Sequence, residues 1–187
     1  MSNIFDAVQA RDLKQVEDCL LAGVEFLLLK GADIEAKDKK TGYTTPLLHA
    51  AYKGNLKMVE FLVSKGANIE AKDNRGYTPL LKAAYKGDLK MVEFLVSKGA
   101  NIEAKDNRGR TPLLEAEYKG DLKMVEFLVS KRVNLAAKNN AGKGVLALAK
   151  KEEVSNFIRK TLRERIIPIL EKLFIKDLAG IVANFLY

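Results

Sequence analysis

The sequence repeats itself at intervals of 33 residues, and this repetition limits the possible folds more than any other feature. The doublet Thr-Pro occurs at Thr45-Pro46, Thr78-Pro79 and Thr111-Pro112, with 33 residues between successive doublets. Segments 55–87 and 88–120 differ at only four of their 33 positions. A fixed period of about 20 to 50 residues is typical of stacked repeats, in which each unit contacts its neighbours. We therefore expect a one-dimensional stack of similar units.

Each unit has the pattern of two short helices joined by a tight turn. Thr78 can cap the first helix with its hydroxyl, Pro79 suits the first helical position, and Gly87 can end the helix in a left-handed conformation. Asp88 can cap a second helix, whose apolar residues recur at helical spacing until Gly99. The following segment is expected to run extended and to end in a turn at Asp-Asn-Arg-Gly. Neither helix can bury its apolar face alone, so a neighbouring unit must supply the partner surface.

The segment 76–106, GYTPLLKAAYKGDLKMVEFLVSKGANIEAKD, resembles the ankyrin repeat. The resemblance covers roughly residues 3–165 and is most specific in the three central units. It implies an all-α solenoid of helix–turn–helix units with hairpin-like loops, and a family of binding scaffolds rather than enzymes. One departure is that Leu48, Leu81 and Leu114 replace the family's His after Thr-Pro-Leu. We therefore expect the inter-repeat hydrogen bond of that His to be absent.

The repeat period divides the chain into a stack at 1–165 and an extension. Terminal repeats are expected to be atypical, because one of their sides faces water. The predicted divisions are an N-terminal cap at 1–38, repeats at about 39–72, 73–105 and 106–138, a C-terminal cap at 139–165, and a C-terminal helical extension at 166–187.

The N-terminal cap departs from the repeat pattern. Residues 24–38 match residues 59–73 closely, although no inner helix precedes them. Apolar residues keep helical spacing across Gly23, which predicts one unusually long helix from about Leu13 to Lys30. The alternative is a helix broken at Gly23, because Gly inside a helix costs about 1 kcal/mol relative to Ala.

The C-terminal part is apolar at helical spacing. Residues 144–166 have the pattern of two helices in a capping repeat, and Pro168 predicts a break or a new helix start. We expect the helices after Pro168 to fold back over the last repeat. Alternatively, residues 173–186 resemble an F-box-like helical segment, which implies recruitment of a ubiquitin-ligase adaptor, although Ile175 replaces the family's Pro. Self-association through the long N-terminal helix or these apolar helices is a further alternative.

The ankyrin resemblance places the binding surface on the concave face, which is built from loop tips and the outward side of the inner helices. Tyr and Arg are favoured there because they bury large areas and combine apolar with polar contact. The matching positions in successive units are Lys39, Lys40, Tyr43, His49, Tyr52 and Lys53, then Asn74, Arg75, Tyr77, Lys82, Tyr85 and Lys86, then Asn107, Arg108, Arg110, Glu115, Tyr118 and Lys119.

The few differences between the two near-identical segments gather near this face. They are Asn55/Asp88, Tyr77/Arg110, Lys82/Glu115 and Ala84/Glu117, and three of the four fall in or beside it. This distribution favours a copied scaffold whose contact surface has been altered. The sequence offers no explanation for the packing of Glu117 in place of Ala84.

The charge of the chain bears on the kind of partner. The net charge is +8, but most Lys and Arg residues alternate with Asp and Glu, as on a solvated surface. The leading hypothesis is therefore a protein–protein interaction module whose partner is another protein with acidic and apolar features. The alternative is nucleic-acid binding through Arg75, Arg108, Arg110 and a basic tail of Arg159, Lys160, Arg163 and Arg165.

Several other classes of function lack their sequence signals. His49 is the single His, so a metal site is not expected, and no cofactor motif is present. Glu60, Glu93 and Glu126 are periodic carboxylates rather than a converging pair, so we expect no catalysis. No apolar run approaches the roughly 20 residues of a spanning helix. The chain has no secretory pattern and one Cys, which favours an intracellular, cytoplasmic protein.

Overall fold

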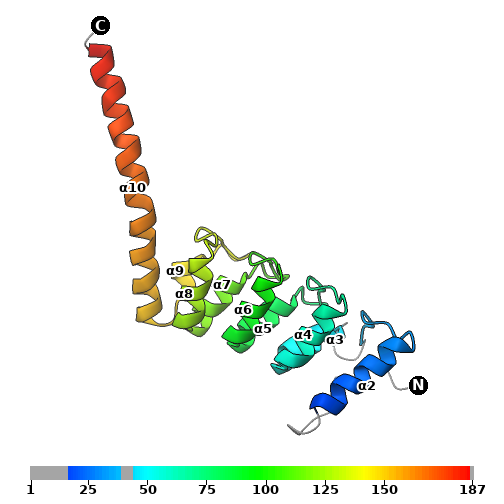
Figure 1. Cartoon of the computed structure of the whole chain (residues 1–187). Coiled ribbons are helices and arrows are strands. Elements are labelled where there is room, and N and C mark those ends of the chain that lie inside the picture. Colours follow the sequence, from blue (N-terminus) through cyan, green and yellow to red (C-terminus); the bar gives the residue numbers. More distant parts are fainter. Residues whose placement is uncertain (1–16, 39–43, 186–187) are drawn as a thin grey trace.

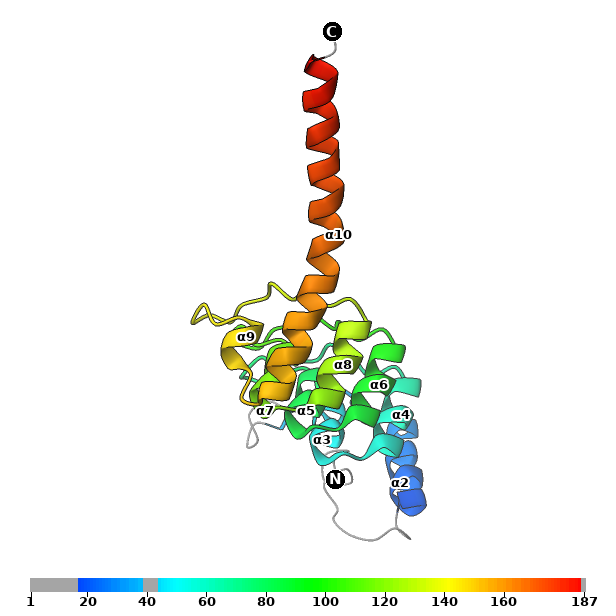
Figure 2. The same ribbon diagram turned by 90° about the vertical axis from the view of Figure 1, so that its left-hand side faces the viewer.

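The structure is a row of helix pairs with one long helix leaving its C-terminal end (Figure 1). It is a computed structural model, and it describes residues 17–38 and 44–185. In chain order the described helices are α2 (Glu17–Leu29), α3 (Pro46–Lys53), α4 (Leu56–Ser64), α5 (Pro79–Lys86), α6 (Leu89–Ser97), α7 (Pro112–Lys119), α8 (Leu122–Ser130), α9 (Val145–Leu148) and α10 (Glu152–Phe185). Viewed along the row, the inner helices α3, α5 and α7 form one layer and the outer helices α4, α6 and α8 the other (Figure 2). The helical solenoid predicted from the sequence is confirmed.

The predicted helix ends are also confirmed in the central units. The Thr78 hydroxyl accepts a hydrogen bond from the Leu81 N–H at 3.2 Å, and Pro79 occupies the first turn of α5. Gly87 ends α5 with φ of 75°, and the Asp88 carboxylate caps α6. These caps satisfy backbone groups that a short helix otherwise leaves without partners. The same caps recur in α3/α4 and α7/α8, so the inner and outer helices keep one geometry along the row.

The core is continuous along the whole row. It runs from Val24 on α2 to Val154 and Ile158 on α10 without a gap between units. The outer-helix phenylalanines Phe61, Phe94 and Phe127 pack against it at equivalent places, each with a lysine ammonium 5.4 to 5.6 Å from its ring centre. The 33-residue period of the sequence is therefore a spatial period as well.

Helix α2 passes through Gly23 without a break, as the helical spacing predicted. Adding a Cβ at Gly23 would meet nothing within 4 Å, so the glycine lies on an open side of the helix. The predicted start at Leu13 lies outside the described residues. Lys65 of the next unit forms an ion pair with Glu25 of α2 at 2.8 Å, which helps to fix α2 against the stack.

The break predicted at Pro168 does not occur. Helix α10 continues through Pro168 to Phe185, and its early turns bury Val154 and Ile158 against the last repeat. The later residues Ile166 and Ile169 are exposed, and the helix extends away from the stack rather than folding back over it (Figure 1). Pro168 is tolerated because it is exposed, so that water can hydrate the backbone carbonyl that loses its helical N–H partner.

The segment after each outer helix is less extended than the sequence suggested. Ile69 and Glu70 form a turn, in which the Ala71 N–H donates to the Asn68 carbonyl at 3.0 Å. The same turn recurs in the next unit, where Ala104 donates to Asn101. This turn brings the chain back toward the inner helices before the loop tip begins.

Candidate protein-interaction surface

The loop tips and the inner helices border an open groove, which we call the inner groove. One hollow of the groove has a volume of about 640 Å³, and its lining includes Tyr52, Arg75, Tyr85 and Arg108. A second hollow continues past Tyr118 toward the C-terminal cap, and Tyr85 and Arg108 line both hollows. The concave face predicted from the ankyrin resemblance is therefore a real depression in the molecule.

A row of tyrosines follows the inner helices along this groove. Tyr52, Tyr85 and Tyr118 are 39%, 38% and 46% exposed, and each is the next to last residue of its helix. We call these three residues the tyrosine ladder. Each inner helix ends one residue later at a lysine, and a glycine caps it.

Each ring of the tyrosine ladder carries a lysine from the following unit. The ammonium nitrogens of Lys86, Lys119 and Lys150 lie 4.7, 4.3 and 3.7 Å from the ring centres of Tyr52, Tyr85 and Tyr118. Contacts of this kind are favourable by about 0.5–1 kcal/mol at exposed sites. The groove therefore displays a repeating pair of aromatic ring and positive charge.

The polar contacts below the loop tip differ between the two near-identical segments. In the first, Lys82 forms an ion pair with Asp73 at 2.6 Å and lies 4.7 Å from the centre of the Tyr77 ring. The Tyr77 ring is itself buried and meets Tyr85 edge-on, with centres 6.2 Å apart. Burial raises the pKa of Tyr77, although Arg110 opposes this effect. Lys82 is therefore held inside the protein rather than presented to a partner.

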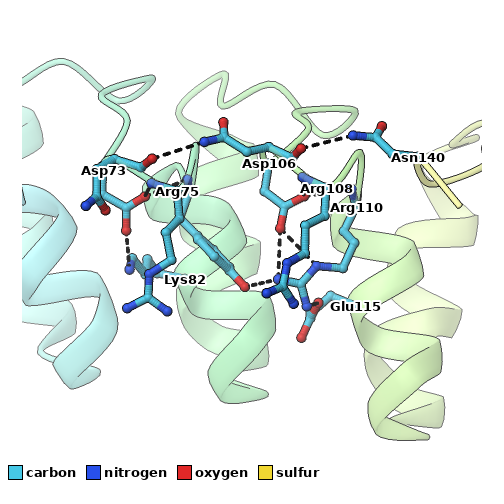
Figure 3. A network of polar contacts seen from close by, with 11 residues as sticks. Asp73, Arg75, Lys82, Asp106, Arg108, Arg110, Glu115 and Asn140 are labelled. Atoms are coloured by element: carbon cyan, nitrogen blue, oxygen red, sulfur yellow. Dashed lines mark hydrogen bonds and ion pairs between the residues drawn. The ribbon is translucent and has the colours of Figure 1, made fainter. Parts of the chain in front are cut away.

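In the second segment Arg110 takes over the role of that lysine. Its guanidinium pairs with Asp106 and with Glu115, each at 2.8 Å, and also donates to the Tyr77 hydroxyl (Figure 3). Burial raises the pKa of Glu115, while Arg110 acts in the opposite direction. For Arg110 itself, burial lowers the pKa but Glu115 and Asp106 raise it by more. The differences Tyr77/Arg110 and Lys82/Glu115 therefore form one coupled exchange that preserves an ion pair, rather than two separate changes of a contact surface.

Of the three arginines predicted to face the groove, Arg75 and Arg108 have guanidinium groups that these contacts do not use. Arg75 and Arg108 are exposed at the loop tips, where their side chains extend toward the inner helices (Figure 3). Within the described ranges 17–38 and 44–185, neither side chain has an ion pair or a hydrogen bond. Their backbone N–H groups donate to Asp73 and Asp106 at 2.9 Å, so the residues themselves are firmly placed.

Neighbouring loop tips are joined to one another. The Asn107 N–H donates to the Arg75 carbonyl at 3.0 Å, and the Asn107 side-chain amide donates to the Asn74 carbonyl. Asn140 repeats both bonds to the preceding tip (Figure 3). A Cβ at Gly76 would overlap Asn107, and Gly76 has φ of 79°, so only glycine fits beneath this bond. Asn107 therefore acts first as a structural link between units.

The remaining predicted positions have mixed outcomes. Lys39, Lys40 and Tyr43 lie outside the described residues. His49 is half-buried, and burial followed by the charge of Lys53 lowers its pKa. Of the first unit, the structure thus brings His49, Tyr52 and Lys53 to the groove.

The groove residues that sequence reasoning missed include Lys150 and Asn140. Lys150 lies between α9 and α10 at a position that does not follow the 33-residue period, so no repeat pattern could have indicated it. Asn140 does follow the period after Asn107 and could have been found in that way.

Glu117 is a buried carboxyl group on α7 that serves none of these contacts. Its side chain is fully buried, and neither carboxyl oxygen has a hydrogen-bond partner within the described residues. Burial raises the pKa of Glu117 to about 8. The corresponding residue of the preceding unit is the small Ala84, which is also buried.

The described part of the chain contains no candidate metal site and no candidate membrane-spanning helix. No group of three or more His, Cys, Asp or Glu side chains there could hold a metal ion. No described helix combines the length and apolar character needed to cross a membrane.

Repeated helix pairs with a shared core and linked loop tips define a repeat solenoid with an open groove. The family model described as "Ankyrin repeats (3 copies)" matches residues 16–106 and 75–141, and the chain therefore belongs to the ankyrin-repeat family. Ankyrin repeats are in general non-catalytic modules for protein–protein interaction. No curated protein matches the chain.

Proposed function

We propose that this protein is a protein–protein interaction module that binds a partner with acidic and apolar features in the inner groove. The observation that carries this proposal is the combination of half-exposed tyrosine rings with the guanidinium groups of Arg75 and Arg108, which form no ion pair with any described residue. Tyr and Arg dominate the binding energy of many interfaces, because they offer large contact areas together with hydrogen bonding. The surrounding loop tips are already fixed by hydrogen bonds, which reduces the entropy lost on binding.

The test compares a face variant with a matched control. The face variant Tyr85→Ala/Arg108→Ala removes one ring and one free guanidinium, whereas the control Arg163→Ala removes a charge from the exposed surface of α10. Proteins captured from the native host by wild type would be identified, purified and titrated against all three forms. We expect the face variant to lose affinity while staying folded, with a melting temperature lowered only by the lost contacts of the Tyr85 ring with Tyr77 and Lys119, and the control to bind as wild type does. Equal binding by the face variant would contradict the assigned surface.

Nucleic-acid binding is a second candidate because Arg75 and Arg108 are free and Arg159 and Arg163 are exposed on α10. Arg110 no longer supports this candidate, because its guanidinium is paired with carboxylates within the protein. This candidate requires an affinity for generic DNA or RNA that falls steeply with salt. Failure of both probes to bind at low ionic strength would remove it.

The ubiquitin-ligase adaptor hypothesis for residues 173–186 gains no support. The family match ends at residue 141, and α10 continues unbroken from the C-terminal cap through residue 185. Nothing along this helix separates an F-box-like unit from the stack.

A further inference from the structure

Equivalent side chains recur along the inner groove at a regular distance, which we call the step length. Packed helices lie about 8–10 Å apart, and α3, α5 and α7 pack side by side in the row. Equivalent residues on these helices, such as the members of the tyrosine ladder, therefore recur along the groove at about this interval. A ligand that uses more than one unit must present its own groups at a similar spacing.

The same chemical group is displayed at each step. The first step combines the Tyr52 ring, the Lys86 ammonium above it and the Arg75 guanidinium at the loop tip. The second step combines Tyr85, Lys119 and Arg108 in the same way. We call these sets the two stations of the groove.

Between the stations the charged groups are paired within the protein, although they do not cancel completely. The Asp73 carboxylate is paired with Lys82, and Arg110 lies between the carboxylates of Asp106 and Glu115. Arg110 meets two carboxylates, so these pairs contribute no free cation. The positive charge facing the groove therefore comes from Arg75 and Arg108, from the lysines over the tyrosine rings, and from Lys53, which lines the same hollow. A complementary ligand presents one anionic group to each station and an apolar surface to the tyrosine rings.

The step length selects one conformation of a peptide ligand. A polyproline II helix rises about 3.1 Å per residue with three residues per turn, so every third side chain lies on one side, about 9 Å apart. A β-strand places residues i and i+3 on opposite faces, because its side chains alternate. An α-helix covers about 9 Å in about six residues, which is not a whole number of turns, so its residues i and i+6 lie on different sides. Aromatic-lined grooves are also the usual receptors for polyproline II segments, since proline rings pack on aromatic faces.

We propose that the inner groove binds an extended, proline-containing acidic segment that carries a carboxylate at every third position. Successive carboxylates contact Arg75 with Lys86 and Arg108 with Lys119, while the intervening prolines lie against Tyr52 and Tyr85. This inference rests on the proposed function, because it names the kind of partner that the same groove accepts.

The test uses two synthetic peptides of identical composition and charge. One is Gly-(Glu-Pro-Ala)4-Gly, and the other collects the four glutamates at one end as Gly-(Glu)4-(Pro-Ala)4-Gly, each with a fluorescent label. We expect the periodic peptide to bind about tenfold more tightly at physiological salt, as measured by fluorescence anisotropy. Arg75→Ala/Arg108→Ala should abolish that advantage. The control Arg159→Ala/Arg163→Ala removes the same charge from α10 and should leave it unchanged.

The possible outcomes separate this inference from the proposed function. If both peptides bind equally and both are weakened by Arg75→Ala/Arg108→Ala, the periodic ligand is wrong but the groove remains the binding surface. If the groove variant and the α10 control bind the periodic peptide equally, the stations and the assigned surface are both wrong. If neither peptide binds at low salt, or if an oligothymidine of equal charge binds more tightly than the periodic peptide, the acidic-segment inference is overturned.

Discussion

Segments 55–87 and 88–120 adopt the same helices, caps and turns, yet they balance their polar groups differently. The first places Lys82 against Asp73, and the second places Arg110 between Asp106 and Glu115. In this exchange the new charges are paired, because the acid at position 115 forms an ion pair with the base at position 110. The other change on the inner helix, from Ala84 to Glu117, has no compensation and leaves a carboxyl group buried without a partner. Two units of almost identical sequence therefore differ in how much each stabilises the stack.

The largest difference is expected at Glu117. Its pKa is about 8 in the folded protein and about 4.5 when unfolded, so between these pH values the folded state holds the extra proton. Stability should therefore fall as pH rises from 4.5 to 8, and the full penalty of roughly 3–5 kcal/mol applies above pH 8. Glu117→Gln keeps the size of the side chain but cannot ionise. We expect this variant to be more stable than wild type at pH 9 and similar to it at pH 4.5.

Denaturant unfolding of both proteins at the two pH values measures this effect. Groups other than residue 117 titrate equally in the two proteins, so their contributions cancel in the difference. A stability gap that is the same at pH 4.5 and pH 9 would show that Glu117 is not buried in its neutral form.

The coupled exchange can be tested by separating its halves. Arg110→Tyr alone leaves Asp106 and Glu115 without their cation, and we expect a loss of about 2–4 kcal/mol in the free energy of unfolding. Adding Glu115→Lys recreates the arrangement of the preceding unit and should recover most of that loss. A double-mutant cycle, measured by denaturant unfolding, yields the coupling energy. Simple additivity of the two substitutions would contradict the exchange.

A smaller effect distinguishes two glycines with the same backbone requirement. Gly109 has φ of 73° and Gly99 has φ of 86°, but only at Gly109 would a Cβ overlap a neighbour, namely Asn140. We expect Gly99→Ala to cost about 1 kcal/mol from backbone strain and Gly109→Ala to cost about twice as much. Thermal unfolding of both variants measures the contrast. Equal losses would mean that the link between loop tips adds nothing to stability.

The smallest expected effect is at Arg108. It lies two residues from Arg110 on the same loop, but its guanidinium has no ion partner in the described part of the chain. Arg108→Ala should therefore change the free energy of unfolding by less than about 0.5 kcal/mol, as is usual for surface positions. A large loss of stability on thermal unfolding would show that Arg108 is structural and unsuited to partner binding.

Most of the fold could be predicted because it follows from local signals repeated three times. Thr-Pro at the helix starts, Gly at the ends and a helical apolar pattern each act within a few residues. Continuity through Gly23 was also predictable, since apolar spacing is preserved across it. Pro168 was misleading because a proline breaks a helix only where the carbonyl that loses its N–H partner cannot be hydrated. Around Pro168 the helix is exposed, so water can hydrate that carbonyl and α10 continues.

The candidate site was less predictable than the fold. The resemblance indicated the positions that face the groove, but not which charges the protein neutralises by itself. Lys82 and Arg110 look like free cations in the sequence, whereas in the structure both are paired with carboxylates. Such pairing depends on distances across the loop and between units. Lys150 could not be anticipated either, because its contact with Tyr118 comes from the irregular end of the stack.

Asn107 and Asn140 link each of the two described junctions between loop tips with the same pair of hydrogen bonds. A whole unit can therefore be added between them without creating a new kind of boundary. A second copy of residues 55–87 inserted after Gly87 would meet native neighbours on both sides and lengthen the groove by about 9 Å. If the groove binds its partner as proposed, the length of ligand contacted is set by the number of units, independently of the identity of any single side chain.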